Sequence, residues 1–138
     1  MCSIPATTSS SLVVLNTLVA DNGGNGIVVQ PQPSAGTLWA AVSESVASNN
    51  GLSGFAVQFV ATIGAVNFTL VRSVAARNGT GISTSGTIPE LPTATVAVGQ
   101  STVTQNGISW SGNVLSFADN YIFANGDGDP APVAIPKK

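Results

Sequence analysis

Residues 55–74 read FAVQFVATIGAVNFTLVRSV, and this stretch holds two runs in which apolar side chains alternate with polar or small ones. Alternation over Phe55–Ile63 and again over Asn67–Val74 is typical of strands with one buried face. Gly64-Ala65 joins the two runs and is too short for a crossover connection, so the strands are predicted to be antiparallel. Arg72 falls in phase with the apolar set, so it either extends from the margin of the sheet or marks an error in this register.

Turn sequences on both sides extend this sheet. The segment Asp21–Gly26 contains Asn-Gly between apolar runs and predicts an N-terminal hairpin over residues 11–32. The main sheet is predicted over residues 37–104, with a bulge or bend at Gly99, where the alternation of the last strand is lost. Neither an internal repeat nor a domain linker is evident, so the chain is expected to form a single domain over residues 1–138.

One segment near the C-terminus has a helical period. Its apolar residues predict an amphipathic helix over residues 113–124, followed by an extended tail over residues 125–138. Asn125-Gly126 would end this helix, and Pro130 would prevent its continuation. The apolar stripe consists of Val114, Leu115, Phe117, Ala118, Tyr121 and Ile122.

This helix is too short to cover the predicted sheet. Three turns span roughly 18 Å, whereas five or six strands lie about 4.8 Å apart. We therefore predict an α+β fold, in which the helix lies across the antiparallel sheet of a second copy and the stripe residues form the interface of an obligate homodimer. The alternative is a monomer whose sheet covers itself, as a closed barrel or a sandwich.

Ionisable side chains are unusually scarce. The 138 residues include four basic side chains, six acidic ones and no histidine, and the mean hydropathy is +0.36. General acid–base catalysis needs groups that titrate near the working pH, so no catalytic residue and no enzymatic activity are expected. A soluble domain normally carries more surface charge, so the surface is predicted to be buried largely against copies of the same chain. The net charge of −2 provides no electrostatic footprint for nucleic acid.

Metal ions, cofactors and small-molecule substrates are not expected as ligands. The segment Asn125–Asp129 resembles part of a calcium loop, but it lacks the later bidentate glutamate and is interrupted by Pro130. Cys2 is the only cysteine and has no partner for a disulfide within the chain. Residues 1–11 lack the features of a secretory leader, and no apolar run is long enough to cross a membrane, so no membrane association is expected.

Five segments together carry a family resemblance. They are LVADNGGNGIVV at 18–29, GTLWAAVS at 36–43, NFTLVRSV at 67–74, PELP at 89–92 and NGDGDPAPVAI at 125–135. In this order they are similar to successive parts of the coat proteins of small single-stranded RNA bacteriophages of the levivirus type. The similarity covers nearly the whole chain, although no single segment is specific.

The resemblance implies a coat protein whose dimers close into an icosahedral shell, so a place in the virion and assembly in the cytoplasm of a bacterial host are expected. It also implies that single-stranded genomic RNA is a partner, with an RNA hairpin bound on the inner face of the sheet. Val71 stands where the family has a lysine, so the contacts with RNA are expected to be weak. By position, the RNA-binding residues would be Gln58, Val60, Thr62, Asn67, Thr69, Val71, Ser73 and Ser101.

Two other classes of protein are compatible with this sequence. A subunit of a surface filament or fibre, without RNA binding, would have the same low charge and the same strand-rich composition. A carbohydrate-binding module would need exposed aromatic side chains on a sheet face, and besides the phenylalanines only Trp39, Trp110 and Tyr121 are available.

Overall fold

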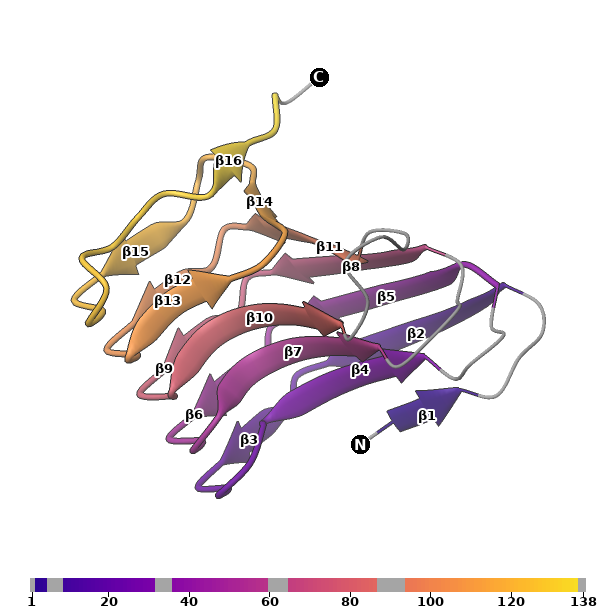
Figure 1. Ribbon diagram of the computed structural model, residues 1–138, viewed down its shortest axis with the longest axis horizontal. Helices are drawn as coiled ribbons and strands as arrows, with labels where there is room; N and C mark the ends of the chain where they lie inside the picture. The colour runs from indigo at the N-terminus through magenta and orange to yellow at the C-terminus, as the bar shows by residue number, and fades with distance from the viewer. Residues whose placement is uncertain (1, 5–8, 32–35, 60–64, 87–93, 137–138) are drawn as a thin grey trace.

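The computed structural model describes residues 2–4, 9–31, 36–59, 65–86 and 94–136, and within these ranges the chain forms sixteen strands and no helix. The strands form three sheets that run along one axis, and every pairing is parallel (Figure 1). The chain passes through the sheets in turn and then repeats the circuit, so the fold is a β-solenoid. We call one such circuit a coil.

The strands are distributed over the three sheets as follows. Sheet A contains β1 (Cys2–Ile4), β4 (Ile27–Pro31), β7 (Ser53–Phe59), β10 (Thr80–Gly86) and β13 (Ile108–Ser111). Sheet B contains β2 (Ser10–Leu15), β5 (Leu38–Ser43), β8 (Val66–Val71), β11 (Ala94–Gly99), β14 (Val114–Ser116) and β16 (Val133–Ala134). Sheet C contains β3 (Leu18–Ala20), β6 (Val46–Ser48), β9 (Val74–Ala76), β12 (Thr102–Thr104) and β15 (Tyr121–Phe123).

The predicted α+β fold with an antiparallel sheet is wrong. Short connections do join consecutive strands, but they turn the chain from one sheet into the next, so these strands never pair with each other. The predicted hairpin over residues 11–32 is instead β2, β3 and β4, which belong to three different sheets. Each strand pairs with the equivalent strand of the coil before or after it, as β5 pairs with both β2 and β8.

The predicted helix over residues 113–124 is also wrong. This segment forms β14 and β15 with a corner between them. Its apolar residues follow a helical spacing only because two short strands meet at that corner. Val114 points into the core and is 2% exposed, whereas Tyr121 is 71% exposed, so the stripe does not form one face. The predicted bend at Gly99 is confirmed, because β11 ends there and β12 continues in another sheet.

The hydrophobic core lies inside the solenoid, enclosed by the inner faces of the three sheets. Its largest fully buried side chains include Phe55, Phe68, Leu70 and Ile82. In β8 the burial alternates as the sequence predicts, with Val66, Phe68 and Leu70 inside. The sheets thus cover themselves, but as a solenoid of parallel strands and not as the closed barrel or sandwich of the predicted alternative. Within the described part of this fold, no apolar sheet face is left for a helix of a second copy to cover, so the reason for predicting an obligate dimer of that kind does not apply.

An internal repeat is present, contrary to the prediction. Hydrogen bonds join equivalent residues 28 positions apart in the first four coils, and 19 positions apart in the last step. The last step is shorter because Gly112, with φ of 85°, turns the chain directly from β13 towards β14. The repeat is carried by a few corner positions, of which the clearest is Asn-Gly at 22–23, 50–51, 78–79, 106–107 and 125–126.

Candidate functional site: the two ends of the solenoid

A ladder of asparagine side chains runs along the corner between sheets C and A. The Asn78 side-chain oxygen Oδ1 accepts hydrogen bonds from the backbone N–H and from Nδ2 of Asn50, at 3.1 and 2.9 Å. Asn78 in turn donates to Oδ1 of Asn106 from its N–H and its Nδ2, at 2.9 and 3.0 Å. Both amides are buried, and these bonds satisfy them inside the core.

A second ladder, of serines, follows the corner between sheets B and C. The Ser73 N–H donates to Oγ of Ser101 at 3.2 Å, and the Ser73 hydroxyl donates to the carbonyl of Val71 at 2.8 Å. Ser45 has the same bonds one coil earlier, and both Ser73 and Ser101 are at most 2% exposed. Each serine of this ladder, which we call a rung as we do each asparagine of the first ladder, therefore forms hydrogen bonds both within its own corner and with the corner of the neighbouring coil.

The residue before each ladder position has a left-handed backbone conformation, with a positive φ. Glu44 and Arg72, before two serines, have φ of 51° and 45°, and their side chains form an exposed ion pair at 3.0 Å. Arg77 precedes Asn78 with φ of 56°. This placement explains why Arg72 falls in phase with apolar residues in the sequence. Arg72 occupies a corner, where the alternation of β8 has already ended.

Two carboxylates close the asparagine ladder at the C-terminal end. Asp129 takes the place of the next rung, because its carboxylate accepts hydrogen bonds from the backbone N–H of Asn125, from Nδ2 of the same residue and from the N–H of Ala124, at 2.8 to 2.9 Å. Asp127 accepts from the N–H and the hydroxyl of Ser109 at 2.9 and 2.7 Å. The carbonyl of Pro130 accepts from Nε1 of Trp110 at 2.8 Å.

These bonds lower the pKa values of both carboxyl groups. For Asp129, the N–H and the side-chain amide of Asn125 hold the pKa below its usual value. For Asp127, desolvation is the largest single effect and acts to raise the pKa, but the hydrogen bonds from the hydroxyl and N–H of Ser109 and from the N–H of Asp129 together outweigh it, so the pKa is lowered. Both groups therefore act as charged acceptors at neutral pH. We call residues 127–130 the C-terminal cap.

The N-terminal end has no such closure in the part of the chain that the structure describes. β2 is the terminal strand of sheet B and β3 that of sheet C, so each has a paired neighbour on one edge only (Figure 1). In sheet A, β1 pairs with β4 and lies at the end instead. A hollow of about 280 Å³ opens between the sheets at this end, lined by Leu12, Val14, Thr17, Val19, Gly26, Ile27 and Val28.

The residues at this hollow are core positions that lack a neighbouring coil. Leu12, Val14 and Ile27 pack against the core, yet they remain only partly buried. Asn22, the first rung, donates to Oδ1 of Asn50 from its N–H and its Nδ2, at 3.3 and 2.9 Å, but its own Oδ1 accepts no hydrogen bond from the described residues. The first coil, formed by β2, β3 and β4, thus presents apolar side chains, strand edges and a ladder acceptor. We call this surface the open end.

The residues expected to bind RNA do not share one surface. Gln58 lies in sheet A, whereas Asn67, Thr69 and Val71 lie on the outer face of sheet B. Ser73 and Ser101 are buried rungs of the serine ladder. Val60 and Thr62 lie outside the described residues. So do Ile63-Gly64, at the predicted connection between two strands, and residues 89–92, which form one of the five segments of the family resemblance.

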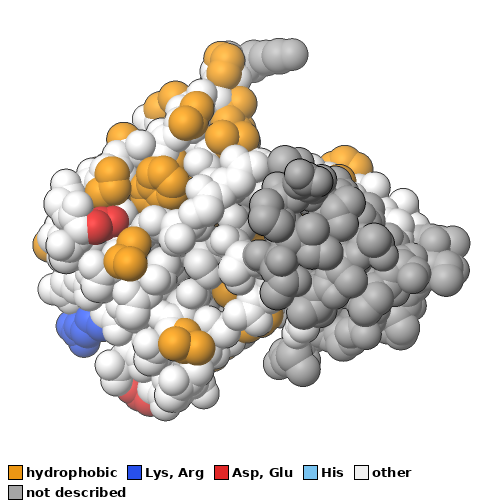
Figure 2. Space-filling view, in the orientation of Figure 1, with side chains coloured by type: hydrophobic (Ala, Val, Ile, Leu, Met, Phe, Trp, Pro, Cys, Tyr) orange, Lys and Arg blue, Asp and Glu red, His pale blue; other side chains and the backbone are white. Residues whose placement is uncertain are grey.

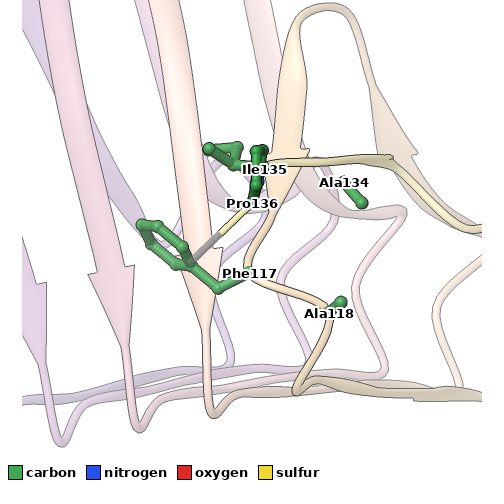
Figure 3. A pocket seen from close by; sticks show the side chains of 5 residues that line it. All are labelled: Phe117, Ala118, Ala134, Ile135 and Pro136. Atoms are coloured by element: carbon green, nitrogen blue, oxygen red, sulfur yellow. The ribbon is translucent and has the colours of Figure 1, made fainter. Parts of the chain in front are cut away.

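The residues expected at a dimer interface surround the last corner. Val114 is a core residue, Leu115 and Ile122 are partly buried, and Tyr121 is exposed. Phe117 and Ala118 line an open apolar hollow of about 480 Å³ together with Ala134, Ile135 and Pro136 (Figure 3). The structure therefore divides this set between the core and the surface.

The ladders and the ends were missed in the sequence, although a signal for them is present. Asn-Gly recurs 28 residues apart three times in the sequence, and in the structure a left-handed residue precedes each of these ladder asparagines. Taken singly, Asn-Gly at 22–23 predicts a hairpin turn and Asn-Gly at 125–126 predicts the end of a helix, and neither reveals the spacing. The described part of the chain contains no cluster of three potential metal-ligating side chains and no helix long and apolar enough to cross a membrane.

Few charged side chains lie on the face shown in Figure 2, where apolar groups are scattered among uncharged polar ones. Nothing in this distribution singles out an anionic or cationic ligand. No family model, curated protein or solved structure matches this chain.

Proposed function

We propose that this protein is a structural subunit that forms a closed homodimer through its open end, which doubles the length of a rigid β-solenoid. The observation that carries this proposal is the difference between the two ends. Terminal strands and an apolar hollow are present at both ends, but at the C-terminal end Asp129 satisfies the last ladder amide, whereas at the N-terminal end no described residue donates to Oδ1 of Asn22.

Exposed strand edges favour pairing with another chain. A two-fold axis through the open end would place β2 antiparallel to β2 of the second copy, with the hollows facing each other. Leu12, Val14, Val19 and Ile27 would then lose their remaining contact with water, which contributes on the order of a few kcal/mol. Such an interface uses the same surface twice and ends at the dimer.

Head-to-tail stacking into a filament is less favourable, because it would bring the open end against the C-terminal cap. The cap already occupies the donors of Asn125 and Ser109. Pro130 and Pro132 have no N–H for a further ladder. The cap therefore works against open-ended growth, and the symmetric pairing is favoured.

The scarcity of charge supports self-association of this kind. Arg72, Arg77, Glu44 and Asp21 lie at corners along the solenoid, and β2 and β3 contain no charged residue. Asp21, at the corner after β3, is the one charged side chain among the described residues of the first coil, so little like-charge repulsion would oppose pairing of the two first coils. The dimer proposed here differs from a shell subunit, because it needs neither an antiparallel sheet nor an exchanged helix.

Sedimentation velocity of the wild-type chain and of two variants tests this proposal. Ser10 and Asn16 donate their N–H groups to the neighbouring coil. Since alternate residues of a strand point to opposite edges, the N–H of Val13 faces the open end. Val13→Pro removes that donor on an edge where proline is tolerated. Val13→Ala is the control, because it shortens the same side chain and keeps the N–H.

We expect the wild-type chain and Val13→Ala to sediment as dimers of twice the 13.8 kDa chain. Val13→Pro should sediment as a monomer with an unchanged far-ultraviolet circular dichroism spectrum. A wild-type chain that stays monomeric over the accessible concentrations would refute the proposal. So would a Val13→Pro variant that is folded and still dimeric, or a wild-type series of ever larger polymers.

A further inference from the structure

The outer face of sheet B carries an exposed tryptophan in a row of polar side chains. The strand register aligns Ser11 in β2, Trp39 in β5, Asn67 in β8 and Thr95 in β11. Strands in a sheet lie about 4.8 Å apart, so this row presents one side chain at each such step along the solenoid axis. The row lies on the outside of the sheet, away from the core, and it begins in β2 at the open end.

The Trp39 side chain is 57% exposed, which is unusual for the largest apolar side chain in a folded domain. Its neighbours in the sheet are small, so the ring stands above them and borders a hollow of about 260 Å³. The hollow is lined by Ser11, Val13, Ala41, Asn67 and Thr69 on the outer face of the sheet, together with Trp39. An aromatic face is therefore available beside a shallow depression.

Uncharged polar groups surround this ring. The amide of Asn67 and the hydroxyls of Ser11 and Thr69 make no side-chain hydrogen bond with other described residues, so they are available to a ligand. Further along the row, Nδ2 of Asn113 donates to Oγ1 of Thr95 at 2.9 Å, which holds that hydroxyl in place. Amides and hydroxyls both donate and accept hydrogen bonds, as the hydroxyl groups of a sugar do.

Charged side chains are missing from the lining of this hollow. The nearest ones along β5 and β8 are Glu44 and Arg72, which lie at the corner and neutralise each other at 3.0 Å. An acidic or basic ligand would find no counter-charge among the lining residues. This excludes a site built for phosphate, sulfate or an acidic sugar.

We infer that the outer face of sheet B binds a neutral oligosaccharide, with one sugar ring stacked on Trp39 and its hydroxyl groups bonded to Asn67, Thr69 and Ser11. A sugar ring has an apolar face of C–H groups and a rim of hydroxyl groups, which matches one aromatic surface with a few polar groups beside it. The sugar chain runs along the row, because one ring spans about the distance between neighbouring strands. The binding site lies on the outer face of sheet B rather than at its edge, although its first residue, Ser11, belongs to β2 at the open end.

An array of neutral oligosaccharides, including glucans, mannans, galactans and xylans, with acidic oligosaccharides beside them, tests this inference. The wild-type protein, Trp39→Ala and Leu52→Ala are compared on the same array, and each bound sugar is then titrated calorimetrically. Leu52 is the matched control, because it is also 57% exposed but lies outside sheet B.

We expect the wild-type protein and Leu52→Ala to bind at least one neutral oligosaccharide equally well. Trp39→Ala should weaken that binding at least tenfold, and Asn67→Ala should weaken it severalfold. Thermal unfolding of both variants establishes that they remain folded. Binding to none of the neutral sugars, binding to acidic sugars only, or binding that does not change in Trp39→Ala would each overturn the inference. A surface that only attracts a second copy would give Trp39-dependent association without any sugar.

Discussion

Asn78 shows how one buried side chain holds three coils together. Its Oδ1 receives two donors of Asn50, while its Nδ2 donates to the carbonyl of Ala47 and to Oδ1 of Asn106. An amide has two donors and one two-site acceptor, and every one of these is used here. A buried polar group is costly unless it is fully bonded, so this position tolerates no shorter side chain.

Replacing Asn78 should therefore cost far more than replacing the exposed first rung. Asn78→Ala leaves the buried N–H of Asn50 without an acceptor and removes the closer of the two acceptors of its Nδ2, and we expect it to lower the free energy of unfolding by about 3 kcal/mol. Asn22→Ala makes the same chemical change at the open end, where water replaces the lost bonds, and should cost less than about 1 kcal/mol. Urea titrations of both variants measure the difference, and equal losses would contradict the role assigned to burial.

At the scale of elements, the strands could be predicted from the sequence but their partners could not. The alternation over β8 and the break after β11 are local signals, and both are correct in the structure. Pairing in a solenoid depends instead on residues 28 positions away. No local pattern distinguishes a hairpin turn from a corner of this kind, because Asn-Gly suits both.

Because pairing depends on distant residues, the sequence also predicts a helix over residues 113–124 that does not form and an RNA-binding set whose members do not share one surface. Val114 and Ile122 come from two strands that both face the core, so their spacing imitates a helical stripe. Ser73 and Ser101 were placed on an accessible sheet face, but they belong to buried corners. The exposure of Trp39 also depends on the small residues that the neighbouring coils place beside it. Only the repeat, taken as a period, could have revealed these relations.

The C-terminal cap should make stability depend on pH. Because the folded pKa values of Asp127 and Asp129 lie below their unfolded values, both carboxylates stabilise the fold above about pH 4. That contribution is lost as the pH falls through the folded pKa values, since the protonated groups bind their donors less well. The urea midpoint of the wild-type chain should therefore drop below about pH 4. Asp127→Asn/Asp129→Asn should drop less steeply, and an identical slope in the two proteins would contradict a charged cap.

At the scale of the whole molecule, stability is distributed in one dimension. Each coil contacts only its neighbours, so the inner coils are supported from both sides and the end coils from one. The C-terminal cap compensates for this at one end, with hydrogen bonds from Asp127 and Asp129. The open end has no equivalent among the described residues, so it is the part of the solenoid most open to fraying or to stabilisation by a second copy.

Hydrogen exchange followed by NMR should therefore reveal the open end as a concentration-dependent region. In the proposed dimer, the N–H groups of Val13 and Leu15 bond across the two-fold axis, whereas in a monomer they face water. Dilution should then speed their exchange at least tenfold, while Leu70 in β8 exchanges slowly at every concentration, because its coil has neighbours on both sides. In Val13→Pro, exchange at Leu15 should be fast already in concentrated solution. If Val13 and Leu15 exchange at the same rate before and after dilution, the first coil is not an interface, and the difference between the two ends must then serve only to end the solenoid.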